Sequence, residues 1–210
     1  MANDERTRLW LVRHGATGWS ENGRHTSVTD LPLLPSGEAD ARRVGERLST
    51  HQFGLVLSSP RRRAVETARL AGFPDPEIDD DLVEWSYGAG EGLTSVEIRD
   101  LIPDWRVWTH GAPKLEREGR FEPGEDVDAV AERLGRVVRR ARESGVSDAL
   151  VFGHGHALRS LAMVWLDFPH PDGRPLPAAH RWGEHPGLRE GVPGAGRLER
   201  RRPLSRRDRP

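Results

Sequence analysis

Three short apolar runs constrain the fold of this chain more than any other feature of its sequence. They are residues 9–12 (LWLV), 55–57 (LVL) and 149–152 (ALVF). None of them alternates between apolar and polar residues, which is typical of strands buried on both faces of a sheet. Each run ends in a short polar or glycine-containing motif. The sequence therefore predicts three central strands, each followed directly by a loop.

Segments with helical periodicity occupy the intervals between and after these runs. Residues 36–51, 125–144 and 156–166 place apolar side chains three and four positions apart, which predicts amphipathic helices. A further helix is expected directly after Pro60, because proline suits the first turn of a helix. Strands that alternate with helices predict a mainly parallel sheet covered on both faces, that is, a three-layer α/β/α sandwich.

The composition excludes several classes of protein. The 32 basic and 33 acidic side chains leave a net charge of −1, so no overall field attracts nucleic acid or an anionic membrane. Because the chain has no cysteine, a disulfide framework, a thiol nucleophile and a sulfur-based zinc site are excluded. The sequence shows neither an export signal nor an apolar run of about 18 residues. We expect a cytoplasmic protein without nucleic-acid or membrane partners; the sequence indicates no oligomeric state.

The character of the chain changes after Asp167. Half of its 16 prolines lie beyond this residue, and residues 197–210 hold seven arginines against two acidic residues. Such a composition usually buries too little apolar area to offset the entropy lost on ordering. We therefore predict one domain at residues 1–167 and a Pro-, Gly- and Arg-rich tail at residues 168–210, with no strand or amphipathic helix in the tail.

The motifs that end the three predicted strands carry the chemistry. They are residues 13–15 (RHG), 58–63 (SSPRRR) and 153–155 (GHG). Because the carboxyl ends of parallel strands meet at one edge of a sheet, two histidines and several arginines are expected side by side. Imidazoles, guanidiniums and helix N-termini together suit a dianion such as phosphate. His14 is the candidate nucleophile, and Gly15 allows the backbone to approach the anion closely.

A proton donor is expected in residues 82–88 (LVEWSYG), where Glu84 is a single carboxylate among apolar and aromatic neighbours. Such a setting suits a general acid, which protonates the leaving oxygen and, once deprotonated, activates water. A loop glutamate taken alone is as often a surface residue. The assignment of Glu84 therefore depends on the other motifs.

Four separated motifs resemble those of the histidine phosphatase superfamily, which includes phosphoglycerate mutases and many small phosphatases. In chain order they are residues 13–17 (RHGAT), 59–64 (SPRRRA), 84–93 (EWSYGAGEGL) and 154–155 (HG). Their order and spacing match over roughly residues 8–168, which makes a chance match improbable. The resemblance implies a phosphoglycerate mutase-like fold and a phosphomonoester hydrolase that needs no metal or cofactor, most similar to actinobacterial acid phosphatases.

The resemblance also implies a role for each motif residue. His14 would carry the phosphoryl group as phosphohistidine, and Glu84 would donate and accept the proton. Arg13, Arg63 and His154 would hold the phosphoryl oxygens, while Arg61 and Arg62 are expected to be solvated. Substrate contacts are implied for Thr17, Ser20, Thr26 and Tyr87. Relatives often carry an asparagine in place of Ser20 and Gln-Gly in place of residues 26–27.

Three alternatives remain open on the sequence. A phosphoglycerate mutase would share the site, although the basic residues between 93 and 124 are scattered. The superfamily's sheet normally ends with a further strand, for which residues 168–210 offer no apolar run, so an inactive scaffold that binds phosphorylated ligands is the second alternative. A metal site at His154 and His156 is the third, but no third ligand stands at a suitable spacing, and His156 is expected only to begin a helix.

Overall fold

A five-stranded sheet with strand order β3-β2-β6-β1-β7 forms the centre of the molecule in the computed structural model, which describes residues 7–117, 119–166, 168 and 196–198. The strands are β1 (Arg8–Arg13), β2 (Leu55–Ser58), β3 (Glu77–Ile78), β6 (Asp148–Gly153) and β7 (Gly196–Leu198). All pairs are parallel except β1 with β7. The mainly parallel sheet predicted from the sequence is confirmed.

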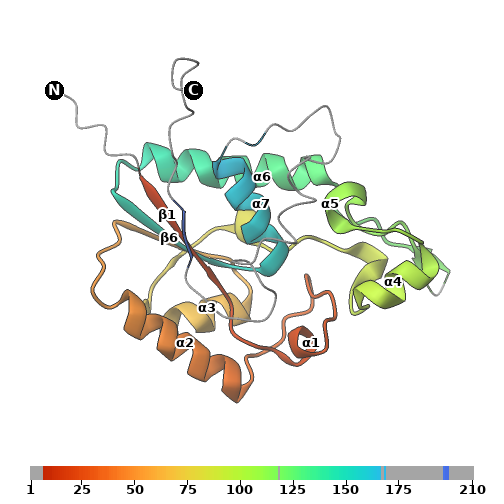
Figure 1. The fold of residues 1–210 in the computed structure, drawn as a ribbon, viewed down its shortest axis with the longest axis horizontal. Helices are drawn as coiled ribbons and strands as arrows, with labels where there is room; N and C mark the ends of the chain where they lie inside the picture. Colours follow the sequence, from red (N-terminus) through yellow and green to blue (C-terminus); the bar gives the residue numbers. More distant parts are fainter. Residues whose placement is uncertain (1–6, 118, 167, 169–195, 199–210) are drawn as a thin grey trace, which may run out of the picture.

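Helices cover both faces of this sheet (Figure 1). One face carries α6 (Val127–Glu143) and α7 (Gly155–Trp165), and the other carries α2 (Pro35–Leu48) and α3 (Arg62–Leu70). Successive side chains of each buried strand point to opposite faces, so the strands supply two apolar cores. The α6/α7 side receives Leu9, Leu57, Ala149 and Val151, and the α2/α3 side receives Trp10, Val12, Leu150 and Phe152. The three-layer α/β/α sandwich is confirmed, and the predicted strands and helices lie within a few residues of their expected bounds.

Shorter elements fill the long connections of the chain. They are α1 (Gly18–Glu21), the 3₁₀ turns η1 (Asp80–Leu82) and η2 (Gly88–Gly90), α4 (Ser95–Leu101), α5 (Val107–His110), and the hairpin of β4 (Glu116–Arg117) and β5 (Arg120–Phe121). Figure 1 shows α1, α4 and α5 on the side of the molecule toward which β1 runs. The connections therefore surround the edge of the sheet where the sequence places the chemistry.

The expectation that residues 168–210 contain no strand is wrong at one place. Gly196–Leu198 pairs antiparallel with β1, with Leu198 opposite Leu9 and Gly196 opposite Leu11. This pairing occupies the edge of β1 that an absent strand would have left open. The remaining tail, residues 169–195 and 199–210, lies outside the described residues, so the domain boundary after residue 167 stays a prediction.

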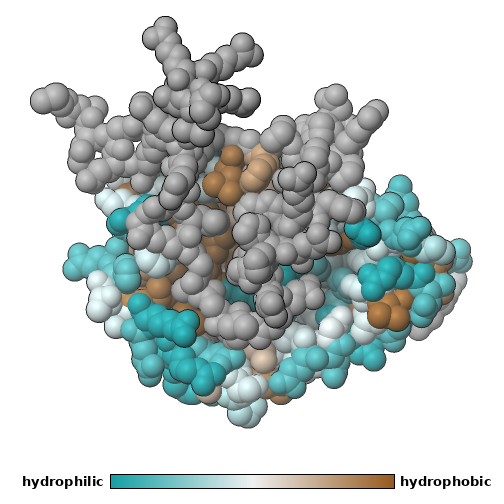
Figure 2. Space-filling model, in the orientation of Figure 1, coloured by the Kyte–Doolittle hydropathy of each residue, from teal (hydrophilic) through white to brown (hydrophobic). Residues whose placement is uncertain are grey.

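The surface over α2 is hydrophilic, as the polar face of an amphipathic helix requires (Figure 2). Its exposed side chains include Arg42, Arg43, Glu46 and Arg47. Among the helices of the described residues, none is long and apolar enough to cross a membrane.

Candidate active site

Strand β6 brings the ends of its two neighbours together. The amide of His14 donates to the carbonyl of Gly153 at 3.0 Å, and the amide of Ser59 donates to the carbonyl of Phe152 at 3.0 Å. Both loops therefore start beside His154, the first residue after β6. The ring centroids of His14 and His154 lie 5.2 Å apart. The two histidines that the sequence assigned to one sheet edge thus face each other.

The imidazole of His14 is held in one tautomer by its own backbone. Its Nδ1 lies 2.7 Å from the carbonyl oxygen of Gly15, so Nδ1 donates and Nε2 is the nitrogen with the free electron pair. Burial lowers the pKa of His14 to about 3, and the positive charges of Arg13 and Arg63 act in the same direction. His14 is therefore neutral near pH 7, as a nitrogen nucleophile must be.

The turn after His14 is fixed by the helices of the α2/α3 face. The amide of Gly15 donates to Oγ1 of Thr67 at 3.0 Å, and this hydroxyl donates to the carbonyl of Arg63 at 2.7 Å. A Cβ atom on Gly15 would lie 2.3 Å from the carbonyl oxygen of Gly37. Only glycine permits this approach, so helices α2 and α3 together set the position of the nucleophile's loop.

Arg63 is completely buried and holds the loop of residues 26–29. Its Nη1 donates to the carbonyl of Thr29 at 3.0 Å, and its Nη2 donates to the carbonyls of Thr26 and Ser27 at 3.2 and 3.3 Å. The carboxylate of Glu91 holds the same loop by accepting from the Ser27 amide and hydroxyl and from the Thr29 amide at 2.5 to 3.0 Å. Arg63 and Glu91 thus fix this loop beside the histidines.

Four buried donors at this sheet edge have no hydrogen-bond partner in the described part of the chain. They are the Nε atoms of Arg13, Arg61 and Arg63, together with Nδ1 of His154 in the tautomer in which the Ser59 hydroxyl donates to Nε2. An unpaired buried donor costs about 1–3 kcal/mol. Four of them in one place fit a ligand rich in acceptor oxygens, and the arginine forks suit a phosphoryl group.

The buried nitrogens of Arg13 and His154 also lie close to the start of α7. A Cβ atom on Gly155 would be 3.5 Å from Nε of Arg13, so the guanidinium packs against the helix N-terminus. The other ring nitrogen of His154, Nε2, is hydrogen bonded to Oγ of Ser59 at 2.8 Å. Burial lowers the pKa of His154 well below its ordinary value, which keeps this ring neutral as well.

The three consecutive arginines at the start of α3 differ more than the sequence indicated. Arg62 is exposed and pairs with Glu66 at 2.6 Å, as expected of a solvated residue. Arg61 is only partly exposed. The pKa of His154 is lowered first by burial, then by His14 and Arg63, and then by the charge of Arg61. Arg61 is therefore less solvated than expected, since it is only partly exposed and its Nε is buried.

Glu84 lies at the N-terminus of α7, and only 7% of it is exposed. One carboxyl oxygen, Oε1, accepts from the amides of Trp85 and Ala157 at 2.9 and 2.8 Å. The other, Oε2, accepts from the amide of His156 at 3.0 Å. The surroundings of the carboxyl are thus more polar than the apolar sequence around it suggested. Since Oε1 accepts two hydrogen bonds and Oε2 accepts one, Oε2 has room for a further hydrogen bond.

Tyr87 is connected to this carboxyl by His156, whose amide bonds Glu84 and whose ring bonds the Tyr87 hydroxyl. Its hydroxyl oxygen is hydrogen bonded to Nδ1 of His156 at 2.6 Å, and the ring of His25 packs edge-on against it. Burial raises the pKa of Tyr87 well above its ordinary value, and the charge of Glu84 adds to this effect. The hydroxyl is therefore neutral at the pH of a cell. His156 begins the helix as expected but also joins Glu84 to Tyr87.

The other three predicted substrate-binding side chains have local partners. Thr17 and Ser20 form a capping box at α1, in which each side chain bonds the other residue's backbone amide at 3.3 and 2.8 Å. The hydroxyl of Thr26 donates to the carbonyl of Arg24 at 3.1 Å. Their substrate contacts stay predictions, and the direct observation is that they shape the loop after the nucleophile.

Sequence reasoning gave no role to several residues that hold the site. Ser59 and Glu91 lie inside the recognised motifs, so their polar side chains were a usable signal. Thr67 gave no signal beyond its place on a buried helix face. Within the residues that the structure describes, no three His, Asp or Glu side chains are grouped so as to hold a metal ion.

The fold is an α/β sandwich, and its site gathers two buried histidines and three arginines with partnerless nitrogens at one edge of the sheet. The family model described as histidine phosphatase superfamily (branch 1) matches residues 9–181, and the chain belongs to that superfamily. The class of enzyme expected from the sequence, a histidine phosphatase, is confirmed.

The chain is similar to characterised proteins over most of its length. An acid phosphatase of Mycobacterium tuberculosis is 41% identical over 79% of this chain and 79% of its own. A 2,3-bisphosphoglycerate-dependent phosphoglycerate mutase of Gloeobacter violaceus is 33% identical over 78% of this chain and 77% of its own. A solved structure of an open reading frame product from Mycobacterium tuberculosis superposes with a TM-score of 0.72, is 39% identical, and covers 84% of this chain and 85% of that one.

Proposed function

We propose that this protein hydrolyses phosphomonoesters, as an acid phosphatase-like enzyme, through a phosphohistidine at His14. The observation that carries the proposal is the neutral ring of His14, its Nδ1 bonded to the Gly15 carbonyl, beside three buried arginine donors and a buried His154 nitrogen without partners. A phosphoryl group placed there would meet the free Nε2 and would supply acceptors to those donors.

In the first step, the Nε2–P bond forms while the bond between phosphorus and the ester oxygen breaks. The leaving oxygen takes a proton from Oε2 of Glu84 and departs as the alcohol. Arg13, Arg63 and His154 donate to the phosphoryl oxygens, where negative charge is concentrated. Nδ1 of His14 keeps its proton throughout, so the ring becomes a phosphorylated imidazolium.

In the second step, a water molecule attacks phosphorus and the P–Nε2 bond breaks. The carboxylate of Glu84 accepts the proton of the attacking water, which restores the acid for the next cycle. Inorganic phosphate leaves, and His14 returns to its neutral form. This scheme uses residues of the chain alone.

Two alternatives to hydrolysis, an inactive scaffold and a mutase, have less structural support than hydrolysis does. The inactive scaffold rested on an open sheet edge beside β1, and Gly196–Leu198 occupies that edge. A mutase needs additional basic side chains near the substrate, yet Arg117 donates to the carbonyls of Ala89 and Glu91 at 3.2 and 3.1 Å. One of the scattered basic residues is therefore committed to the backbone.

The test is hydrolysis of p-nitrophenyl phosphate in excess EDTA. We expect phosphate release by the wild type, loss of at least about 1000-fold in His14→Ala, and a phosphoenzyme that is stable to base and labile to acid in rapid-quench experiments with labelled substrate. Activity that disappears with EDTA and returns with zinc would contradict the scheme. With 3-phosphoglycerate, isomerisation without net phosphate release would identify a mutase instead.

A further inference from the structure

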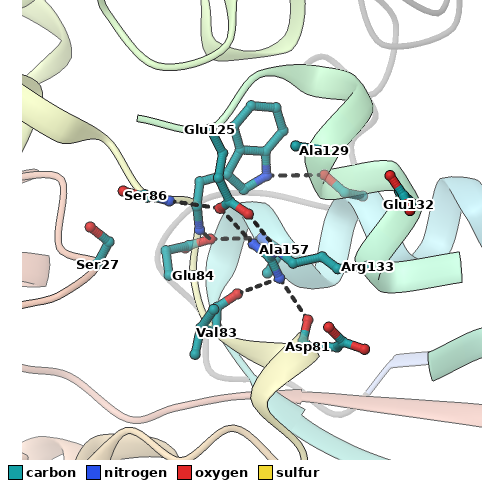
Figure 3. Close-up of polar contacts among 12 residues, drawn as sticks. Ser27, Asp81, Val83, Glu84, Ser86, Glu125, Ala129, Glu132, Arg133 and Ala157 are labelled. Carbon is teal, nitrogen blue, oxygen red and sulfur yellow. Dashed lines mark hydrogen bonds and ion pairs between the residues drawn. The ribbon is translucent and has the colours of Figure 1, made fainter. Parts of the chain in front are cut away.

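An ion pair between a buried arginine and a partly buried glutamate lies behind the general acid and takes no part in the proposed reaction (Figure 3). Arg133, on α6, is 7% exposed. Its Nε donates to Oε1 of Glu125 at 2.7 Å, and its Nη2 donates to Oε2 at 3.0 Å. The planar guanidinium thus meets the carboxylate through two parallel bonds, the geometry that lysine cannot reproduce.

The remaining bonds of this pair end on the backbone on both sides of Glu84. Nη1 of Arg133 donates to the carbonyls of Asp81 and Val83 at 2.6 and 2.9 Å. Oε2 of Glu125 accepts from the amide of Ser86 at 2.9 Å, and the Glu125 amide donates to the Ser86 carbonyl at 2.8 Å. Figure 3 shows Arg133 between Glu125 and these carbonyls. Backbone groups of Asp81, Val83 and Ser86 are therefore tied to α6 or to the residues just before it.

This attachment matters because the segment around Glu84 has little regular structure of its own. Between η1 and η2, residues 83–87 form neither helix nor strand. The carboxyl of Glu84 is held by the amides at the start of α7. The backbone of its neighbours Val83 and Ser86 is held by Arg133, on α6, and by Glu125, just before α6. The direction of the carboxyl toward the substrate therefore depends on both helices.

Stability alone is a weak explanation for the pair. Removing two charges from water costs about as much as their attraction gains, so well-packed apolar side chains often serve a fold equally well. Arg133 stands on the buried stripe of α6 between Val130 and Val137, where an apolar residue would pack. What the charged side chains supply, and apolar side chains cannot, is three directed bonds to the backbone beside Glu84.

We propose that Glu125 and Arg133 are positioning residues that hold Glu84 where it protonates the leaving oxygen. The proposal rests on the proposed function, in which Glu84 is the general acid. Neither residue touches the reacting atoms. Their loss should therefore weaken the protonation of the leaving group and leave nucleophilic attack by His14 intact.

The distinguishing measurement is the dependence of the rate on the leaving group. Arg133→Met and Glu125→Gln should lose about 100-fold in kcat/KM on β-glycerophosphate, whose alkoxide needs a proton. They should lose less than about 10-fold on 2,4-dinitrophenyl phosphate, whose phenolate leaves unprotonated. A merely structural defect would lower both rates by the same factor, and that result would overturn the proposal.

Arg136→Met is the matched control. Arg136 lies on the same helix and also reaches η1, but it bonds the carboxylate of Asp81 at 2.8 and 2.6 Å rather than the backbone beside Glu84. It should keep both rates within about 3-fold of the wild type. A selective loss on β-glycerophosphate in this control as well would contradict the assignment to Arg133.

A double-mutant cycle provides the second readout. If Arg133 acts through Glu84, adding Arg133→Met to Glu84→Gln should cost less than about 3-fold more on β-glycerophosphate. Fully additive losses would overturn the proposal. If Arg133→Met does not fold, Glu125→Gln, which keeps the side chain's shape, decides both tests. The proposed function is judged separately, by His14→Ala and the trapped phosphoenzyme, so the two can fail independently.

Discussion

The proposed nucleophile and the proposed acid are each oriented by backbone groups rather than by other side chains of the site. The carbonyl of Gly15 fixes the tautomer of His14, and the amides of Trp85, His156 and Ala157 fix the carboxyl of Glu84. Backbone groups move little, so both orientations exist before substrate binds. This preorganisation is the main electrostatic contribution that a folded site makes to phosphoryl transfer.

Glu91 should affect substrate binding more than turnover. Its carboxylate holds Ser27 and Thr29, in the loop that Arg63 contacts from the other side. In Glu91→Ala this loop loses the carboxylate that fixes it, and Arg63, which bonds the loop's carbonyls, is then less firmly positioned. We therefore expect KM for p-nitrophenyl phosphate to rise about 10-fold, with kcat within about 3-fold of the wild type. Steady-state kinetics and the inhibition constant of inorganic phosphate measure this. Glu97→Ala, which removes a carboxylate from the exposed cap of α4, is the control and should leave KM unchanged. An unchanged phosphate inhibition constant in Glu91→Ala would contradict the assignment.

At the scale of elements, the three central strands were predictable because each is a continuous apolar run, and the long helices because their apolar periodicity extends over several turns. The short elements were not. Helix α4 is defined by a capping box between Thr94 and Glu97, and α1 by one between Thr17 and Ser20. Over four to seven residues such caps carry most of the signal, and periodicity carries almost none.

Strand β7 shows a different limit of sequence reasoning. Gly196–Leu198 contains a glycine, an arginine and a single apolar residue. Its pairing with β1 comes from the free edge of that strand, which offers a row of backbone donors and acceptors to any segment that reaches it. An edge strand is therefore specified by its neighbour, and its own three residues do not predict it.

The contact between α2 and the loop of His14 should tolerate no side chain. A Cβ atom on Gly37 would lie 2.4 Å from the carbonyl oxygen of Ala16. We expect Gly37→Ala to lower the free energy of unfolding by about 2 kcal/mol or more and to reduce activity, because the backbone beside His14 must shift. Gly135→Ala, in the middle of α6, meets nothing closer than 3.7 Å and should stabilise by about 1 kcal/mol. Urea unfolding of both variants measures the difference, and equal effects would contradict this reading of the contact.

At the scale of the whole molecule, the site is assembled from segments that are distant along the chain. The four motifs pointed to His14, Arg63, Glu84 and His154 because each motif is short and contains only a few side chains that suit phosphoryl chemistry. The supporting pair of Glu125 and Arg133 carries no such motif. Its one signal was a charged residue on the apolar stripe of α6, which indicates a buried partner without naming it. Which loop that partner holds follows only from the packing of α6 against residues 81–86.

The burial of two neutral histidines makes the stability of the whole molecule depend on pH. The pKa of His14 falls from an ordinary value of 6.5 to about 3 on folding, and that of His154 is also lowered. Between these pH values the unfolded chain binds protons that the folded chain does not. Stability is therefore complete above about pH 6.5 and decreases as the pH falls toward 3.

Urea unfolding between pH 8 and pH 5 should reveal this loss. From its pKa shift, His14 alone should lower the free energy of unfolding by about 2 kcal/mol at pH 5, and His154 should act in the same direction. Because other histidines also titrate, the decisive comparison is between variants. His14→Asn and His154→Asn should each make the decline between pH 6.5 and pH 5 shallower than in the wild type, whereas His51→Asn, at an exposed position, should leave it unchanged. If both buried-histidine variants kept the wild-type slope, the two rings would have to bind protons in the folded protein as they do in the unfolded chain, and His14 would lose its free nitrogen below about pH 6.5.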